Sequence, residues 1–149
     1  MHIGLIGGIG PAATEYYYRG LIEHYARSSI ALDLTIVHAD VREMARNLAK
    51  GAAQEQAEIF SGLIQRLAAA GAEIAAVTSM GGHFCIRELA AISPLPLLNA
   101  IPEVDAAIRQ RNLKTVGIIG TRNVMESGLY GGITSARIVA PKYADSQLR

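Results

Sequence analysis

The sequence predicts an α/β protein with a parallel sheet, and two observations lead to that prediction. Short apolar runs alternate with segments of helical periodicity, which is the pattern of βαβ units. Half of the residues are hydrophobic and only 5% are aromatic, which is typical of helices packed closely on a sheet. The strands are expected near residues 2–6, 34–39, 73–78, 96–99, 115–119 and 137–140.

Helical patterns fill the intervals between these strands. Pro11 is suited to the first position of a helix, and Gly71 is a typical stop signal after one. At least one of the tyrosines Tyr16–Tyr18 is expected to pack in the core, because helical spacing turns them to different faces. Residues 41–50 fit either a loop or a short helix. The helices are expected near residues 11–27, 54–70, 83–91 and 102–112.

The charge balance argues against nucleic-acid and membrane partners. The chain has 14 basic and 13 acidic residues without runs, and no basic stripe with interleaved aromatic residues. No apolar stretch is long enough to span a bilayer and no signal peptide is visible, so the expected location is the cytoplasm. Cys85 is the single cysteine, which excludes an internal disulfide and a thiolate-rich metal site.

The segment Gly7–Pro11, which follows the apolar run Ile3–Ile6, is the most informative stretch of the chain. A strand followed by glycines and a helix start places backbone N–H groups at a positive helix end, which suits a phosphate or a carboxylate. The segment Ala76–His83 has a similar design. Since the carboxyl ends of parallel strands meet at one edge, both turns are expected to face a shared cleft. His38 and Asp40 fall short of a metal site, and no metal is expected.

Two other interpretations of the first turn remain open. Gly8–Ala13 fits the dinucleotide pattern G-x-G-x-x-A, and Asp40 follows the next strand as a ribose-binding acid does. Against an NAD site, Pro11 has no amide donor and Asp40 comes later than the usual spacing. The second interpretation is that these glycines only make a tight turn.

Three motifs together resemble the aspartate/glutamate racemase family of cofactor-independent amino-acid racemases. Ile3–Thr14 is similar to the family's N-terminal signature G-G-M-G-P-x-A-T. Ala72–His83 is similar to its first catalytic junction, an apolar strand followed by C-N-T-x-H. The opening of the family's second half is similar to Val116–Thr121 with Met125, Gly128 and Tyr130.

The resemblance implies a racemase that acts on aspartate or glutamate without pyridoxal phosphate or another cofactor. Racemisation needs an acid/base group on each face of the α-carbon, and the family uses two cysteines, one from each half. Here Thr78 stands at the first cysteine position, and the chain stops at Arg149 before the second. The 149-residue chain is therefore expected to be impaired or inactive. The carboxylate pocket is expected to be lined by Gly8, Ile9, Ser79, Met80, Gly81 and Thr121.

Three further residues have two interpretations each. Arg42 either pairs with the side-chain carboxylate of the substrate, as the resemblance implies, or is an exposed arginine without a role. His83 either orients a carboxylate or caps the turn. Cys85 is expected to be a small buried hydrophobic residue that does not replace a catalytic cysteine.

The resemblance also implies a flavodoxin-like fold with three layers, in which helices flank both faces of a sheet of order 2-1-3-4. Residues 1–114 would form the first domain, and residues 115–149 the start of a second, similar domain. A homodimer is expected to cover the apolar surface that a missing half-domain leaves. The competing hypothesis is a binding module that keeps the carboxylate pocket and has lost the chemistry.

Overall fold

The computed structural model describes residues 1–141, and the chain divides into two compact units. The first unit is Met1–Asn99, and the second begins at Ala100. The expected division into domains at residue 115 would assign the intervening helix to the first domain, and that division stays a prediction. Each unit is described by itself below.

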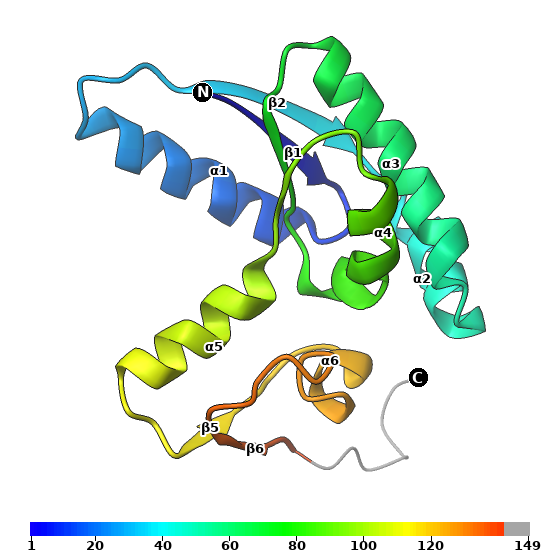
Figure 1. Ribbon diagram of the computed structural model, residues 1–149, viewed down its shortest axis with the longest axis vertical. Helices are drawn as coiled ribbons and strands as arrows, with labels where there is room; N and C mark the ends of the chain where they lie inside the picture. The colour runs from blue at the N-terminus through cyan, green and yellow to red at the C-terminus, as the bar shows by residue number, and fades with distance from the viewer. Residues whose placement is uncertain (142–149) are drawn as a thin grey trace. The chain divides into compact units, whose positions relative to one another are not determined.

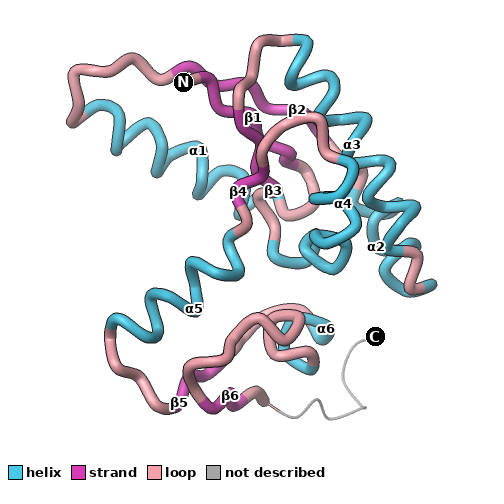
Figure 2. The backbone as a smooth tube through the Cα atoms, viewed as in Figure 1, coloured by secondary structure: helices cyan, strands magenta, loops and turns pink. Residues whose placement is uncertain are grey.

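The first unit is a parallel α/β sheet with helices on both faces, as predicted. Its strand order is β2-β1-β3-β4 and every strand pair is parallel (Figures 1 and 2). The elements are β1 (His2–Gly7), α1 (Pro11–Ala26), β2 (Asp33–His38), α2 (Val41–Lys50), α3 (Ala53–Ala69), β3 (Ile74–Val77), the 3-10 helix η1 (Met80–Cys85), α4 (Ile86–Ile92) and β4 (Leu97–Leu98).

The main core lies between the sheet and α3. Figure 1 shows α3 and α4 on one face of the sheet and α1 on the other. Strand alternation sends Ile6 and Val77 to the α3 face, where they join a cluster of buried side chains. Phe60, Ile64 and Leu67 of α3 are fully buried in this cluster. The burial of these large side chains on one face provides most of the hydrophobic stabilisation of the unit.

The α1 face is packed more thinly, and here one prediction is wrong. No residue of α1 is buried, and its contact with the sheet runs through Leu21 and Tyr25 in its second half. The three tyrosines of the first half are exposed by 78% (Tyr16), 38% (Tyr17) and 44% (Tyr18). None of them packs in the core, because only the later turns of α1 lie against apolar side chains of the strands.

Residues 41–50 form a helix, which settles the open choice between a loop and a helix. The side chain of Asp40 accepts hydrogen bonds from the amides of Arg42 and Glu43 at the start of α2. Gly51 ends the helix in the left-handed conformation, with φ of 68°. The helix expected near residues 83–91 begins earlier, as η1, and continues as α4.

The second unit contains α5 (Ala100–Gln110), β5 (Thr115–Gly117), α6 (Arg122–Glu126) and β6 (Arg137–Val139), with β5 and β6 parallel. The buried carboxylate of Asp105 on α5 accepts hydrogen bonds from the amides of Thr134 and Ser135 and from both hydroxyls. The bonds from Ser135, then from Thr134, hold the pKa of Asp105 well below its usual value. Asp105 thus ties the segment before β6 to α5.

The uneven packing of the two sheet faces predicts a difference between two matched substitutions. Ile64→Ala on α3 is expected to lower the free energy of unfolding by about 2–5 kcal/mol, because it empties a fully buried site. Ile22→Ala on α1, where the side chain is 41% exposed, is expected to cost less than about 1 kcal/mol. Urea unfolding followed by circular dichroism measures both. Equal losses would contradict the assignment of the core to the α3 face.

Candidate functional site

The two glycine-containing turns are neighbours at the carboxyl edge of the sheet. β1 and β3 are adjacent strands, and their ends lead into Gly8–Gly10 and Ser79–Gly82. A Cβ atom added at Gly10 would lie 3.7 Å from Ser79 Oγ. The hydroxyl oxygens of Thr14 and Thr78 are 3.0 Å apart. The turns therefore meet across Ser79 and are joined by the two threonines.

The end of β2 comes to the same edge through Gly8. Gly8 has a φ angle of +92°, and a Cβ atom there would lie 2.5 Å from the carbonyl oxygen of Ala39 and from Nδ1 of His38. Only glycine fits both the backbone angle and the close approach. The exposed ring of His38 consequently lies beside the first turn.

The amides of the first turn are not equivalent. The N–H of Gly8 donates to Thr14 Oγ1 at 3.3 Å, whereas the amides of Ile9 and Gly10 make no hydrogen bond within residues 1–141. The Ile9 side chain is buried in the main core cluster, so Ile9 can offer a ligand only its backbone. Two amides at the positive end of the 16-residue helix α1 suit one anionic group.

Thr78 is buried, and its hydroxyl is hydrogen-bonded inside the protein. It donates to the carbonyl oxygen of Ile6 at 3.0 Å and pairs with Thr14, which in turn reaches the carbonyl of Gly10 at 3.2 Å. Both ends of this chain are carbonyl oxygens, which do not take up a proton at neutral pH. A hydroxyl becomes a base or nucleophile only beside a group that removes its proton. The contacts of Thr78 are therefore those of a hydroxyl that donates and accepts hydrogen bonds, and none of them would activate it as a base.

Ser79 lies between the two turns, and its hydroxyl is available to a ligand. It is half-buried, and its Oγ makes no hydrogen bond within the described residues. Met80 and Gly81, which begin η1, are half-buried beside it, and a Cβ atom at Gly81 would lie 3.5 Å from Ser79 Oγ. The Ser79 hydroxyl can thus donate to an anion that the Ile9 and Gly10 amides also contact.

His83 is held in one tautomer by the second turn. Its Nδ1 lies 2.9 Å from the carbonyl oxygen of Ser79, and because a carbonyl only accepts, Nδ1 carries the hydrogen. Burial lowers the pKa of the imidazole, so Nε2 is a bare acceptor, buried without a partner among the described residues. A bare nitrogen repels a carboxylate. Of its two interpretations, capping of the turn is the one that this geometry favours.

Arg42 and Asp40 lie at the start of α2. The Asp40 carboxylate caps the helix, and the bonds from the Arg42 and Glu43 amides lower its pKa. This use of the carboxylate does not favour a ribose-binding role. The Arg42 side chain is 87% exposed, with Nε 3.9 Å from Asp40 Oδ1. Its pairing with a substrate carboxylate stays a prediction.

Cys85 belongs to η1, where its thiol donates to the Gly82 carbonyl of the second turn at 3.5 Å, and Thr121 belongs to the second unit. Cys85 is buried, and burial raises the pKa of its thiol to about 12, so it is not a thiolate at neutral pH. Thr121 precedes α6 in the second unit and makes no side-chain capping bond, and its place in a carboxylate pocket stays a prediction. Within residues 1–141, no three His, Cys, Asp or Glu side chains are grouped so that they could hold a metal ion. No helix in this part of the chain could span a membrane.

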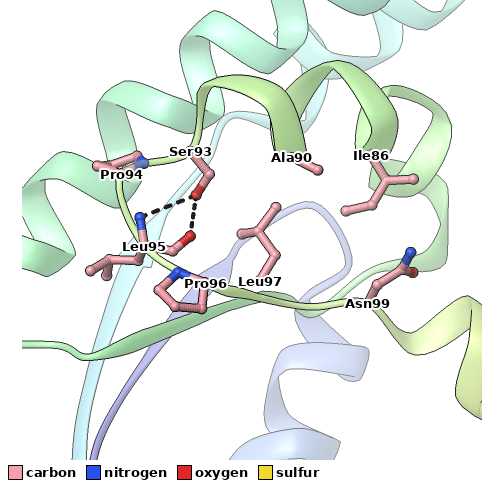
Figure 3. A pocket seen from close by; sticks show the side chains of 8 residues that line it. All are labelled: Ile86, Ala90, Ser93, Pro94, Leu95, Pro96, Leu97 and Asn99. Atoms are coloured by element: carbon pink, nitrogen blue, oxygen red, sulfur yellow. Dashed lines mark hydrogen bonds between the residues drawn. The ribbon is translucent and has the colours of Figure 1, made fainter.

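A cavity of about 480 Å³ lies elsewhere in the first unit, between α4 and the segment that leads into β4 (Figure 3). The Ser93 hydroxyl donates to the Leu95 carbonyl and accepts from the Leu95 amide, which closes one side of it. None of the predicted site residues lines this cavity. The lining residues are Ile86, Ala90, Ser93, Pro94, Leu95, Pro96, Leu97 and Asn99.

Sequence reasoning gave Thr14 no role, although the structure places it between the two turns. The available signal was its position four residues after Gly10, from which a threonine hydroxyl reaches back to a carbonyl. The contact with Thr78, 64 residues away, had no signal in the spacing of the motifs.

Three solved structures are similar to the chain. A protein from Yersinia pestis, provisionally described as an Asp/Glu racemase, is 31% identical with a TM-score of 0.81, over 95% of this chain and 65% of that one. An aspartate racemase homologue from Pyrococcus horikoshii is 24% identical with a TM-score of 0.76, and the match covers 95% of this chain and 64% of that one. Glutamate racemase from Aquifex pyrophilus is 21% identical with a TM-score of 0.60, and the match covers 99% of this chain and 58% of that one. The last two likenesses show the fold alone. No curated protein matches the chain.

The fold and the paired turns thus define a parallel α/β unit whose candidate site lies at the carboxyl edge of the sheet. The family model of Asp/Glu/hydantoin racemases matches residues 6–149. The chain belongs to this family, as its three sequence motifs predicted. It spans less than two thirds of the length of each of the three structures described above.

The environment of His83 predicts a pH dependence of stability. The pKa of His83 is lowered in the folded state. The neutral ring therefore contributes fully to the free energy of unfolding above the pKa of the unfolded state, about 6.5. This contribution is lost as the pH falls through that pKa towards the pKa of the folded state. His83→Asn keeps a donor for the Ser79 carbonyl and does not titrate. Urea unfolding between pH 7.5 and 5 is expected to show a loss of stability in the wild type that this variant lacks.

Ser28→Ala, on the loop after α1, is the control, because it removes no titratable group and its pH profile of unfolding should follow that of the wild type. If the wild type and His83→Asn lost stability in parallel as the pH fell, the account of a neutral, buried His83 would be wrong.

Proposed function

We propose that the chain has the function of an amino-acid racemase of the aspartate/glutamate type, which moves the α-proton without pyridoxal phosphate. In this proposal the first unit holds the α-carboxylate at the paired turns. Amides of Ile9 and Gly10 and the hydroxyl of Ser79 donate to it, and Met80 and Gly81 line the pocket beside them. Arg42 would pair with the side-chain carboxylate.

The observation that carries the proposal is the meeting of the two turns at Ser79. A Cβ atom added at Gly10 would be in van der Waals contact with Ser79 Oγ, at 3.7 Å, so the two turns lie side by side. Neutral donors stabilise the charge that develops on a carboxylate when the neighbouring α-carbon loses its proton. Family membership supports the reaction type, and the names of the three similar structures agree with it.

Thr78 takes the first acid/base position in this proposal, on one face of the α-carbon. Its hydroxyl contacts explain why we expect the 149-residue chain to be a weak catalyst. Cys85 does not supply the missing base, because its thiol is buried and protonated. The proposal also includes a homodimer in the cytoplasm. The exposed apolar side chains of α1, such as Tyr16 and Ile22, support an association of two copies.

A non-catalytic binding module is the second candidate function, and the Thr78 contacts favour it. A pocket that keeps its carboxylate donors and has no ionisable group bonded to Thr78 binds an amino acid without removing its proton. An NAD site is the least favoured function, because Asp40 caps α2 and Pro11 has no amide to offer a phosphate.

The proposal predicts binding of aspartate or glutamate and slow exchange of the α-proton. In deuterium oxide, NMR of L- and D-aspartate and of both glutamates measures exchange, and calorimetry measures binding. Ser79→Ala is expected to weaken binding about tenfold, since a hydrogen bond to a charged group contributes about 1.5 kcal/mol. Ser28→Ala, on the loop after α1, is the control and should bind as the wild type does.

The outcomes separate the candidates. Exchange above the rate in buffer that Thr78→Val abolishes supports the racemase. Binding without any exchange supports the binding module. If neither amino acid binds, both candidates are wrong, and protection against thermal unfolding by NAD would then indicate the nucleotide site.

A further inference from the structure

The hydroxyl of Thr14 makes more contacts than its place in the first turn of α1 requires. It accepts the Gly8 amide at 3.3 Å, lies 3.2 Å from the Gly10 carbonyl and is 3.0 Å from Thr78 Oγ1. A threonine near a helix start commonly reaches only the carbonyl four residues back. Thr14 therefore links three parts of the site: the first turn, the helix start and the end of β3.

The two hydroxyls have two hydrogens, and two arrangements keep a hydrogen bond between them. In the first, Thr78 donates to the Ile6 carbonyl and Thr14 donates to Thr78. In the second, Thr78 donates to Thr14 and Thr14 donates to the Gly10 carbonyl. The Ile6 and Gly10 carbonyls also accept the Thr78 and Thr14 amides, at 3.1 and 3.0 Å. Neither carbonyl is left without a partner in either arrangement, so the pair can switch together.

This freedom matters when an anion arrives at the turns. Thr78 can turn its hydrogen from Ile6 towards a bound amino acid, because the Ile6 carbonyl keeps the Thr78 amide as its donor. Thr14 meanwhile donates to Thr78 Oγ1, and a hydroxyl that accepts a hydrogen bond becomes a better donor. The same Thr14 oxygen holds the Gly8 amide, which keeps the first turn in place.

We propose that Thr14 is a positioning residue, which sets the Thr78 hydroxyl and the Gly8 turn for a bound amino acid. This inference rests on the proposed function for the identity of the ligand. The coupling between Thr14 and Thr78 is a property of the free protein and does not depend on it. A purely local role of Thr14 at the helix start would leave the two threonines independent of each other.

Two substitutions separate the hydroxyl of Thr14 from its methyl group. Thr14→Val keeps the methyl group, which packs where a side chain at Gly7 would lie, and removes the hydroxyl. Thr14→Ser keeps the hydroxyl and removes the methyl group. The matched control is Thr35→Val on β2, which loses a hydrogen bond to His2 at the start of β1, in the part of the sheet away from the turns.

The experiment measures binding of L-aspartate and L-glutamate by calorimetry, with the amide exchange of Gly8 and the free energy of unfolding in the free protein. Thr14→Val is expected to weaken binding about tenfold and to speed exchange of the Gly8 amide. Thr14→Ser and Thr35→Val should bind within about twofold of the wild type. In a Thr78→Val background, Thr14→Val should change binding less than about twofold, because the two hydroxyls act as one unit.

Additive effects of the two substitutions on binding, or wild-type binding by Thr14→Val, would overturn the inference. If the wild type binds neither amino acid, the proposed function fails, and the free protein then decides the positioning role. Non-additive unfolding free energies for Thr14→Val and Thr78→Val, with faster Gly8 exchange in Thr14→Val, would support it. Additive unfolding energies would refute it.

Discussion

The candidate site depends on one backbone constraint, the left-handed conformation of Gly8 beneath the end of β2. With φ of +92° and no side chain, Gly8 lets the Ala39 carbonyl and the His38 ring approach the first turn. A side chain there would displace either the turn or the end of β2. Because the Gly8 amide bonds to Thr14 and Thr14 bonds to Thr78, the position of the second turn relative to the first follows from the same constraint.

The sheet register explains why the two faces of the first unit are packed so differently. A row of side chains runs across the α1 face: Leu5 lies opposite Ile36 and Ala76, and Ala76 lies opposite Leu98. Leu5 and Ala76, in the middle of the row, are buried, whereas Ile36 and Leu98 at its ends are 41% and 50% exposed. α1 therefore covers the centre of the row and leaves both margins open. On the other face, α3 and the elements beside it bury nearly all of the apolar side chains of the strands.

The sequence predicted the strands and their order because apolar runs and glycine turns are local signals, and the family resemblance supplied the topology. It left residues 41–50 open, because the Asp40 cap that starts α2 is a contact and not a periodicity. It also predicted a buried tyrosine on α1, because spacing along a helix shows which residues share a side and not how far the sheet beneath extends. The Thr14–Thr78 contact depends on the register that pairs Ile6 with Val77, and a slip by one residue would turn Thr78 to the other face.

A racemase must both hold its substrate and move a proton, and the residues at the carboxyl edge of the sheet serve these two tasks unequally. Holding a carboxylate needs hydrogen-bond donors in fixed positions. The Ile9 and Gly10 amides and the Ser79 hydroxyl are such donors, and all three are uncharged. Moving a proton needs an ionisable group. The hydroxyl pair ends at backbone carbonyls, and it is hydrogen-bonded to no titratable side chain within residues 1–141. His83, which underlies the second turn, is neutral and turns its only hydrogen to Ser79. The described residues of the first unit are thus built for recognition first, and any proton transfer at Thr78 requires a base that these hydrogen bonds do not include.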